Sequence, residues 1–511
     1  MASKIKVDTL ETANGSGSIT INNPINTAGI TSVTLGTSNF VAGVNAGNSI
    51  TSGGNYNTVV GDEAGTAITT GTRNTATGYG SLEDCTTGEH NSAFGLASLA
   101  SNTTADNNTA VGYAALNANT TADNNTAVGY SSLGANTTGA DNTAVGQGAL
   151  DANTTASYNT AVGASALTSN TTGTQNVASG VNSLQDNTTG SYNVASGVNS
   201  LQNNTTGANN VAMGQEALRL NTTGSANASI GYGCLDSNTT GNHNNALGYL
   251  ALQANTTGEQ NTAIGGTALY SNTTAINNTA VGYNSMGANT TGHSNVAVGK
   301  GALNANTTGS YNIAVGLAAL DDNTTGGGDI AIGANALQTN TTGLDNTAVG
   351  TNCLRYNTTA SNNTAFGSSA LTANTTGTGN TAVGRNAGNN ITTGSNNIMI
   401  GNYAHSSANG SEIVIGNGIA GRGNNTGLIY PPGGGHMYQA TNLTTWAQTS
   451  DERLKKNIVD NNVGLVKINA IQVRNFDYKT AEEIESDGVF NSNQAIVKTG
   501  TQLGVIAQEL E

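Results

Sequence analysis

This sequence has little charge, little proline and few aromatic side chains. Only 9% of its 511 residues are charged and 4% are aromatic, and it contains 3 prolines against 69 glycines. Disordered chains usually combine a high net charge with abundant Pro, Glu or Lys, so this composition does not fit that class. The net charge of −15 gives no support to nucleic-acid binding, which needs a basic surface to neutralise phosphates.

Long apolar runs and clustered cysteines are also missing. No apolar run reaches the length of about 18 residues that indicates a membrane span, so we expect no membrane insertion. The N-terminal sequence MASKIKVDTLETANG lacks the apolar stretch of a secretory signal. Cys85, Cys234 and Cys353 show neither metal-binding nor disulfide spacing. We expect three buried thiols, and no metal or other cofactor.

The sequence instead contains a repeat of 17 residues. A glycine recurs at this interval from Gly61 to Gly401 without a slip, which makes 21 glycines. The residue four positions before this glycine is Asn in 20 of 21 coils, with Asp329 as the exception. The residue four positions after it is Leu in 17 of 18 coils, with Met286 in the other. A fixed period of this length predicts a solenoid.

The consensus NTAVGxxALxxNTTGxx favours β structure. The segment TAVG predicts a strand, and ANTTG predicts a corner, because Asn and Thr bond to nearby backbone and Gly adopts positive φ easily. A segment such as YAALNAN fits either a second strand or a turn. We expect a mostly β fold, a parallel β-roll or solenoid of about 21 coils. Stacked Asn columns would pair amide to amide, and Leu and Val columns would form a continuous apolar core.

Composition divides the chain into four segments. The solenoid shaft is predicted at 43–403, because variant coils lie near both of its ends, as caps of a stack do. Residues 1–42 form an attachment or cap segment, and 404–449 form a junction. Residues 451–511 contain 7 basic and 10 acidic residues, against 5 and 17 in the 341 residues of the repeat. The last segment, 450–511, therefore predicts a small α+β domain, with a strand at IQVRNFDY (471–478).

The coils carry a first resemblance. The NTAVG repeats resemble the head repeats of trimeric autotransporter adhesins and the repeat shafts of phage tail fibres. The resemblance implies a homotrimer in which three chains share one roll. Residues 1–42 resemble the opening of phage tail fibres, which implies attachment to the virion baseplate or tail.

A second resemblance covers 450–511. The motifs SDERLKKNI, VRNFDYK and GVIAQELE occur there in this order, and they resemble the auto-processing intramolecular chaperone that ends endosialidase tailspikes. The resemblance implies that this domain helps three chains to register and then cuts itself off between Ser450 and Asp451. It also implies that Ser450 is the nucleophile and Lys455 its base, a workable pair because a Ser hydroxyl needs a nearby base. The family usually continues into further helices, so we expect this domain to be truncated.

The residues alone leave alternatives open. Ser450 and Asp451 also fit a helix N-cap, with Lys455 solvated. The whole chain could be a bacterial surface adhesin without processing, or an ice-binding solenoid, since regular Thr arrays resemble those of ice-binding proteins. A glycan-degrading enzyme is disfavoured because no carboxylate pair recurs.

The sequence therefore predicts a structural protein. We expect a homotrimeric phage tail fibre, located in the virion and assembled in the host cytoplasm. Variable loop positions or the segment 404–449 would contact a host receptor or glycan. The C-terminal domain would be at most a single-turnover Ser/Lys endopeptidase, and no turnover enzyme is expected in the repeats.

Overall fold

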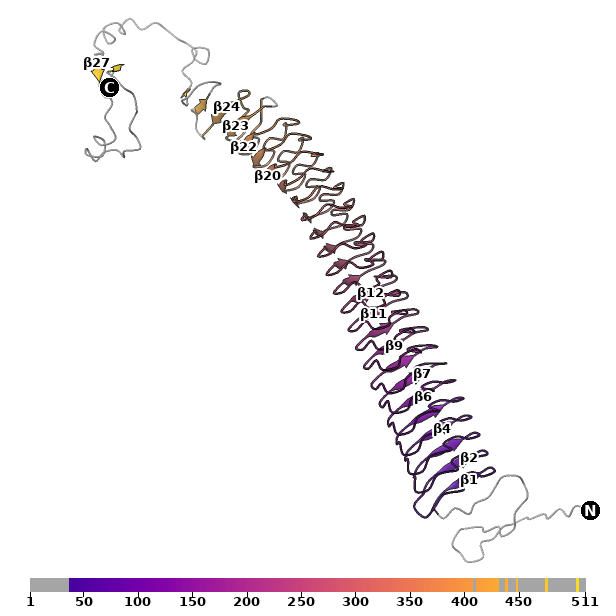
Figure 1. The fold of residues 1–511 in the computed structure, drawn as a ribbon. Coiled ribbons are helices and arrows are strands. Elements are labelled where there is room, and N and C mark those ends of the chain that lie inside the picture. Colours follow the sequence, from indigo (N-terminus) through magenta and orange to yellow (C-terminus); the bar gives the residue numbers. More distant parts are fainter. Residues whose placement is uncertain are drawn as a thin grey trace, which may run out of the picture. The chain divides into compact units, whose positions relative to one another are not determined.

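The computed structural model describes residues 36–407, 410–431, 437–439, 447–448, 474–476 and 502–504. The chain divides into two units, Met1–Gln448 and Thr449–Glu511. The first unit contains a parallel β-solenoid (Figure 1), which confirms the predicted fold class. The described residues contain no helix, and hence none that is long and apolar enough to cross a membrane.

Each coil contributes one short strand to a single sheet, and consecutive strands pair in parallel. The rest of each 17-residue coil consists of turns and bends, so the YAALNAN segment is a turn and not a second strand. The parallel strands are β1 (Phe40–Ala42), β2 (Thr58–Val60), β3 (Thr75–Thr77), β4 (Ser92–Phe94), β5 (Thr109–Val111), β6 (Thr126–Val128), β7 (Thr143–Val145), β8 (Thr160–Val162), β9 (Val177–Ser179), β10 (Val194–Ser196), β11 (Val211–Met213), β12 (Ala228–Ile230), β13 (Asn245–Leu247), β14 (Thr262–Ile264), β15 (Thr279–Val281), β16 (Val296–Val298), β17 (Ile313–Val315), β18 (Ile330–Ile332), β19 (Thr347–Val349), β20 (Thr364–Phe366), β21 (Thr381–Val383), β22 (Ile398–Ile400), β23 (Glu412–Ile415) and β24 (Thr426–Ile429).

The strand register follows the repeat. From β2 to β22 the paired residues are 17 positions apart, as in Val111 with Val128. Each position of the consensus therefore forms a column of equivalent residues, spaced by about 4.8 Å. Beyond residue 403 the stack continues with shorter coils: Ile398 pairs with Ile413, 15 positions on, and Ile413 pairs with Gly427, 14 positions on.

The stack of parallel strands ends in two antiparallel strands. Strand β25 (Met437–Gln439) pairs antiparallel with β24, and β26 (Ala447–Gln448) pairs antiparallel with β25. In the second unit, β27 (Arg474–Phe476) pairs antiparallel with β28 (Gln502–Gly504). Strand β27 lies within the segment for which the sequence predicts a strand.

The apolar core consists of Ala and Leu columns. Ala110, in the middle of β5, and Leu116 in the following turn are both fully buried, whereas Val111 is 37% exposed and Val162 is 42% exposed. Side chains alternate along a strand, so the residues on either side of an inward Ala point outward. The prediction that the Val column belongs to the core is therefore wrong, because Ala occupies the inward position.

Two buried Asn columns run beside this core. In the first, the corner ladder, each Asn precedes the Thr-Thr pair. Asn136 Nδ2 donates to Asn119 Oδ1 at 2.9 Å and to the Gly139 carbonyl oxygen at 2.9 Å. The predicted amide-to-amide pairing is confirmed in this column. Each amide thus satisfies a buried group in its own coil and another in the preceding coil, as buried polar groups require.

The second column, the strand ladder, contains the Asn that precedes each strand. The backbone N–H of Asn108 donates to Asn91 Oδ1 at 3.0 Å, and Asn108 Nδ2 donates to the Ala122 carbonyl oxygen at 2.9 Å. Asn108 Oδ1 in turn accepts the N–H of Asn125 at 2.9 Å, so backbone and side chain of this residue together join three coils. The invariance of Asn in the repeat follows, because the position needs both an acceptor and a donor.

The corner ladder is closed by apolar residues at both ends. Its last member, Asn374, has an Oδ1 atom without a hydrogen-bond partner, because the next coil has Ile391 at this position. At the other end, Asn102 Nδ2 lies 3.8 Å from Cys85 Sγ, and the coil before Cys85 has Ile68. These substitutions are those expected of terminal coils, since Ile leaves no further amide to satisfy.

The Leu column has a left-handed backbone. Leu116 has φ 51° and Leu354 has φ 48°, and the other leucines of the column are similar. This conformation costs an L-residue roughly 1–2 kcal/mol. Full burial of a Leu side chain contributes roughly 1.5–3 kcal/mol. Burial therefore outweighs the strain in the coils that have Leu here, whereas two variant coils have Gly65 and Gly388, which adopt this conformation without strain.

Candidate functional site

The outward face of the sheet carries a continuous apolar stripe. We define the stripe as the first and last residues of the strands from β2 to β22, such as Thr109 and Val111 in β5. The last-residue column is apolar in 18 of its 21 positions, whereas the first-residue column is polar in 13 of its 21 positions, most of them Thr. Neither column contains a charged residue at any position. An uncharged face of this length is unusual for the surface of a monomer.

Neighbouring positions compensate where the last residue of a strand is polar. Strand β9 ends in Ser179, but it begins with Val177, which is 41% exposed. Val181, which follows the repeating glycine Gly180, is 45% exposed. The next coil repeats this pattern. Where β3 ends in Thr77, the exposed Tyr79 follows the glycine. Every coil therefore presents at least one large apolar side chain on this face.

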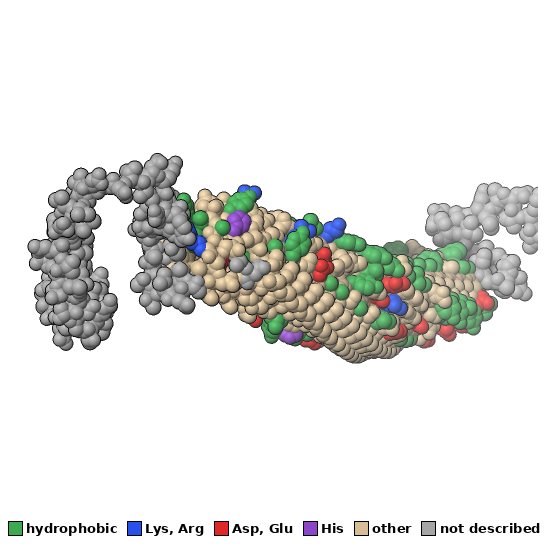
Figure 2. All heavy atoms as spheres, turned by 90° about the horizontal axis from the view of Figure 1, so that it is seen from above, with side chains coloured by type: hydrophobic (Ala, Val, Ile, Leu, Met, Phe, Trp, Pro, Cys, Tyr) green, Lys and Arg blue, Asp and Glu red, His purple; other side chains and the backbone are tan. Residues whose placement is uncertain are grey.

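The column that follows the glycine forms one edge of the stripe, and we call it the rim column. Tyr113 and Tyr130 stack there, with ring centroids 5.2 Å apart and ring planes 8° apart. The rim column also carries charge, at Asp62, Lys300 and Arg385. Figure 2 shows hydrophobic side chains gathered along the border of a broad face of polar side chains and backbone. The charges place the rim column in water beside the uncharged stripe.

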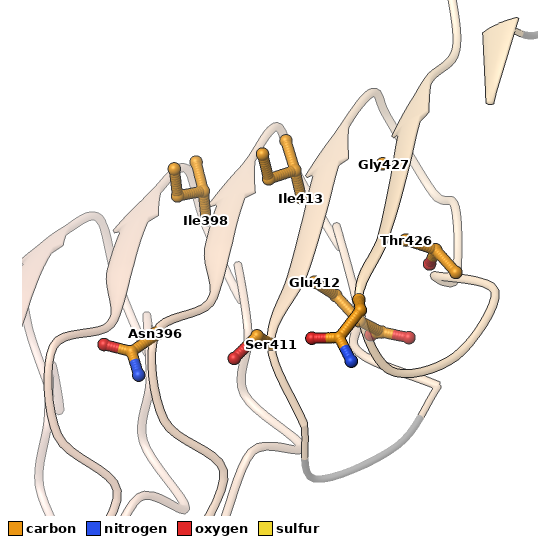
Figure 3. Close-up of a pocket in the computed structure, with 8 residues that line it drawn as sticks. Asn396, Ile398, Ser411, Glu412, Ile413, Thr426 and Gly427 are labelled. Atoms are coloured by element: carbon orange, nitrogen blue, oxygen red, sulfur yellow. The ribbon is translucent and has the colours of Figure 1, made fainter. Parts of the chain in front are cut away.

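A pocket of about 250 Å³ lies over β22, β23 and β24 (Figure 3). It lies in the continuation of the first-residue column, where Ile398, Ile413 and Gly427 are aligned. Since Gly427 has no side chain, the row of isoleucines ends in a hollow. The lining residues are Asn396, Ile398, Ser411, Glu412, Ile413, Asn425, Thr426 and Gly427.

Glu412 is buried beside this pocket and occupies the strand-ladder position of its coil. Its N–H donates to Asn397 Oδ1 at 2.9 Å, as an Asn of the ladder would. Its carboxylate accepts hydrogen bonds from the Ser406 hydroxyl at 2.7 Å, from the Ser407 N–H and hydroxyl at 2.9 and 2.6 Å, and from the Gly423 N–H at 2.6 Å. The carboxylate is thus bound by the chain's own donors and closes the strand ladder.

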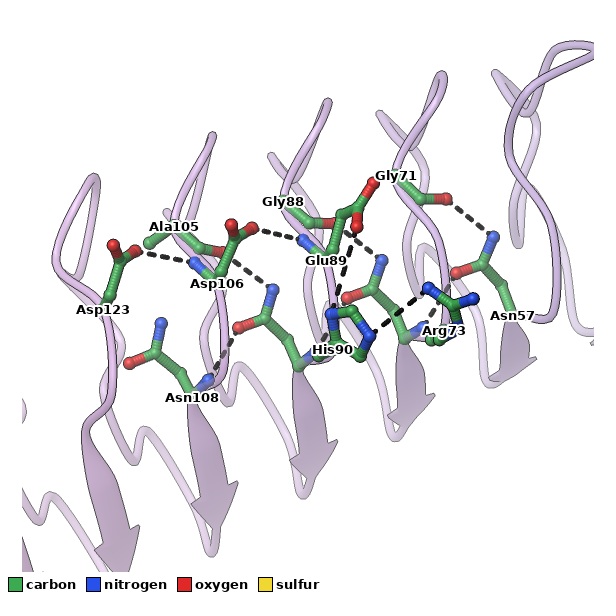
Figure 4. A network of polar contacts seen from close by, with 12 residues as sticks. Asn57, Gly71, Arg73, Gly88, Glu89, His90, Ala105, Asp106, Asn108 and Asp123 are labelled. Carbon is green, nitrogen blue, oxygen red and sulfur yellow. Dashed lines mark hydrogen bonds and ion pairs between the residues drawn. The ribbon is translucent and has the colours of Figure 1, made fainter.

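The variable polar side chains near the corners also bind to the chain's own backbone. Asp106 Oδ1 accepts the N–H of Glu89 at 2.6 Å, and Asp123 Oδ1 accepts the N–H of Asp106 at 2.8 Å. Figure 4 shows these carboxylates in a row. In the same view, His90 Nε2 lies 3.4 Å from Arg73 Nη1. Carboxylates held in this way replace missing backbone acceptors.

The Thr-Thr pairs lie at a bend of each coil. The first hydroxyl of a pair is bound to the next coil, as Thr103 Oγ1 donates to the Thr120 carbonyl oxygen at 3.0 Å. The second residue, such as Thr104, is exposed. The exposed part of this array is therefore a single column of hydroxyl groups.

The three cysteines are buried and free, which confirms the prediction of buried thiols. Burial raises the pKa of the Cys85 thiol to about 11 and that of Cys353 to about 12. Thiols of this kind are not ionised at neutral pH and are poor nucleophiles. The described residues also contain no group of His, Cys, Asp and Glu that could hold a metal ion.

The predicted cleavage site lies outside the described residues. This holds for Ser450, Asp451 and Lys455, so the Ser–Lys pair stays a prediction. The sequence predicts that self-association into a fibre would cover exposed Val and Ala surface, but it does not locate the apolar stripe. Its signal was the variation in side-chain size: the last-residue column ranges from Ser179 to Phe366, which a packed core position would not tolerate.

Comparison with known proteins gives one match. Residues 450–511 match the model of the family described as chaperone of endosialidase, which covers 62 of the 511 residues. No curated protein and no solved structure matches the chain. The segment that contains Ser450 and Lys455 is therefore similar to the chaperone of endosialidase, and it follows a β-solenoid with an exposed apolar stripe.

Proposed function

We propose that this chain is the subunit of a homotrimeric phage tail fibre. The solenoid is the shaft, the N-terminal segment attaches it to the virion, and variable surface positions contact a host receptor or glycan. The observation that carries the proposal is the match of residues 450–511 to the chaperone of endosialidase. The uncharged stripe supports it, because a shaft that assembles with copies of itself needs such a face.

The repeat explains why the shaft needs an assembly domain. Equivalent residues recur every 17 positions over 21 coils, so two chains paired one coil out of step would lose few contacts. A C-terminal domain that brings three chains together fixes the register once. Its removal afterwards would leave a kinetically stable fibre, because misaligned chains could not easily start again.

The proposed removal is a single cut between Ser450 and Asp451. Lys455 takes the proton of the Ser450 hydroxyl, Oγ attacks the carbonyl carbon of the Ser450–Asp451 peptide bond, and the C–N bond breaks as Lys455 gives the proton to the leaving Asp451 amine. One water molecule then hydrolyses the ester and leaves a free carboxylate at Ser450. For this step Lys455 must be neutral, which requires partial desolvation to lower the pKa of its ammonium group. Arg cannot replace it, since its guanidinium stays charged.

The intact mass of the purified chain tests the cut. We expect the parent to lose 451–511, and the Ser450→Ala and Lys455→Arg variants to keep these residues. Ser492→Ala is the matched control and should be cut like the parent. If parent, variants and control all stay whole, the self-cleavage part of the proposal is wrong.

A further inference from the structure

We propose that the apolar stripe is the contact surface between copies of this chain, packed parallel and in register. The inference rests on the proposed function for its parallel orientation, but the surface itself comes from the outward residues of β2 to β22. These columns contain no charged residue, whereas the adjacent rim column contains Asp62, Lys300 and Arg385. The centre of an interface is depleted of charged residues relative to its rim, which is the pattern found here.

The size of the stripe fits an interface. Twenty-one coils at about 4.8 Å give a length of about 100 Å, and two outward residues per strand give a width of roughly 10 Å. The resulting area of roughly 1,000 Å² per chain exceeds the roughly 800 Å² that each partner contributes to a standard interface.

The spacing of the stripe identifies the partner. A surface with one apolar side chain every coil is matched along its whole length only by a surface with the same rise per coil. A second copy of the chain has that rise. Globular partners or single helices would match the stripe over a few coils, so a second copy is the occupant that covers all of it.

The irregular coils favour one register. In β9 the apolar side chain lies at the first residue, Val177, because the last residue is Ser179, and β10 has the same pattern at Val194 and Ser196. In the coils before and after, the last residue is apolar, as in Val162 and Met213. Parallel copies in register place Val177 opposite Val177, whereas a slip of two coils places Ser179 against an apolar side chain. Polar groups buried without partners oppose the slip.

Disulfide cross-linking of the full chain tests this surface. Under mild oxidation, the Val298→Cys variant, on the stripe, should form linked dimers, to at most about two thirds of the chains in a three-fold assembly. The control is Thr308→Cys, exposed in the corner of the same coil, which should not link within the assembly. Co-assembled Val298→Cys and Val315→Cys chains should link mainly to their own kind, since these positions are offset by one coil of about 4.8 Å. The parent, with its three buried cysteines, sets the background.

The outcomes separate the inference from the proposed function. An assembled chain that links through Thr308→Cys and not through Val298→Cys would overturn the stripe as the interface and leave the proposed fibre standing. A preference for links between Val298→Cys and Val315→Cys over links within each kind would overturn the in-register packing. A parent chain that is monomeric in solution would overturn the fibre and this inference together.

Discussion

Asp329 accepts two hydrogen bonds from Asn346, from the backbone N–H at 2.8 Å and from Nδ2 at 3.0 Å. It is the one Asp in a strand ladder otherwise made of Asn from Asn57 to Asn397. A ladder Asn donates its Nδ2 to a carbonyl oxygen 14 residues on, as Asn312 does to Gly326 at 2.9 Å. An ionised Asp329 cannot make that donation.

The charge of Asp329 makes the stability of its coil depend on pH. Burial raises the pKa of Asp329 from 3.8 to about 7. The folded state holds this proton more tightly than the unfolded state, so the stability is fully present below about pH 4 and is lost as the pH rises to about 7. By linkage the loss amounts to roughly 4 kcal/mol. Asp329→Asn should therefore raise stability at pH 8 and change it little at pH 4.

Denaturant midpoints at pH 4 and pH 8 check this prediction. Asp141→Asn is the matched control, because Asp141 is exposed and lies next to the ladder residue Asn142. Its midpoint should follow that of the parent at both pH values. If the denaturant midpoint of Asp329→Asn changed with pH as that of the parent does, the buried carboxylate would not be the cause of the pH-dependent stability.

The corner ladder predicts that removal of one Asn amide lowers the unfolding free energy markedly. Asn238 Nδ2 donates to Asn221 Oδ1 at 2.8 Å and to Gly241 O at 3.0 Å, and its Oδ1 accepts from Asn255 at 2.8 Å. Asn238→Ala leaves the buried Asn221 Oδ1 without a donor and removes one of the two hydrogen bonds of Gly241 O and of Asn255 Nδ2. This should cost roughly 2–4 kcal/mol of unfolding free energy. Asn203→Ala, at a half-buried position where many coils have Ala, should cost less than about 1 kcal/mol. Equal losses in the two variants would contradict a structural role for the ladder.

The glycine that recurs every 17 residues occupies a position that tolerates no side chain. Gly248 has φ 137°, and a Cβ atom there would lie 2.7 Å from the carbonyl carbon and oxygen of Gly265. Gly248→Ala combines backbone strain with a backbone clash and should cost roughly 2–6 kcal/mol. In Gly266→Ala the new Cβ would lie 3.5 Å from the Tyr283 ring, so its melting temperature should stay close to that of the parent. A comparable drop in both variants would count against this account of the 17-residue glycine period.

Substitution of Glu412 should cause local opening at the C-terminal end of the solenoid. Its carboxylate accepts hydrogen bonds from Ser406, Ser407 and Gly423. In Glu412→Gln an amide NH₂ must face some of these donors, which should cost roughly 1–3 kcal/mol. Hydrogen exchange should become faster in β23 and β24 and stay unchanged in the middle coils. Glu83→Gln, at an exposed position, is the control, and unchanged exchange in the Glu412→Gln variant would refute the closing role.

The repeat allowed much of the fold to be predicted, because stacking turns each sequence position into a column. The strand at TAVG, the paired Asn columns and the buried thiols such as Cys353 follow from this. The side of the sheet on which Val111 lies did not, since Ala and Val are both apolar and only backbone geometry decides which points inward. The left-handed φ of Leu116 was also hidden, because it contradicts the local preference of Leu and depends on burial.

The candidate functional site, like the fold, could be predicted only in part from the sequence. The assembly surface became visible only when the structure placed the last-residue column outside the core. The motifs around Ser450 and Lys455 are recognised from sequence, and residues 450–511 match the chaperone of endosialidase. Their chemistry depends on how close the two side chains come, which sequence spacing does not give.

The mass of the purified chain in solution, measured by sedimentation equilibrium, tests the central claim most directly. The account predicts a particle of three chains, which persists on dilution because each chain covers its apolar stripe with the others. A mass of one or two chains would contradict it. The β-solenoid would then be a shaft of another kind, and its exposed stripe would need a different partner.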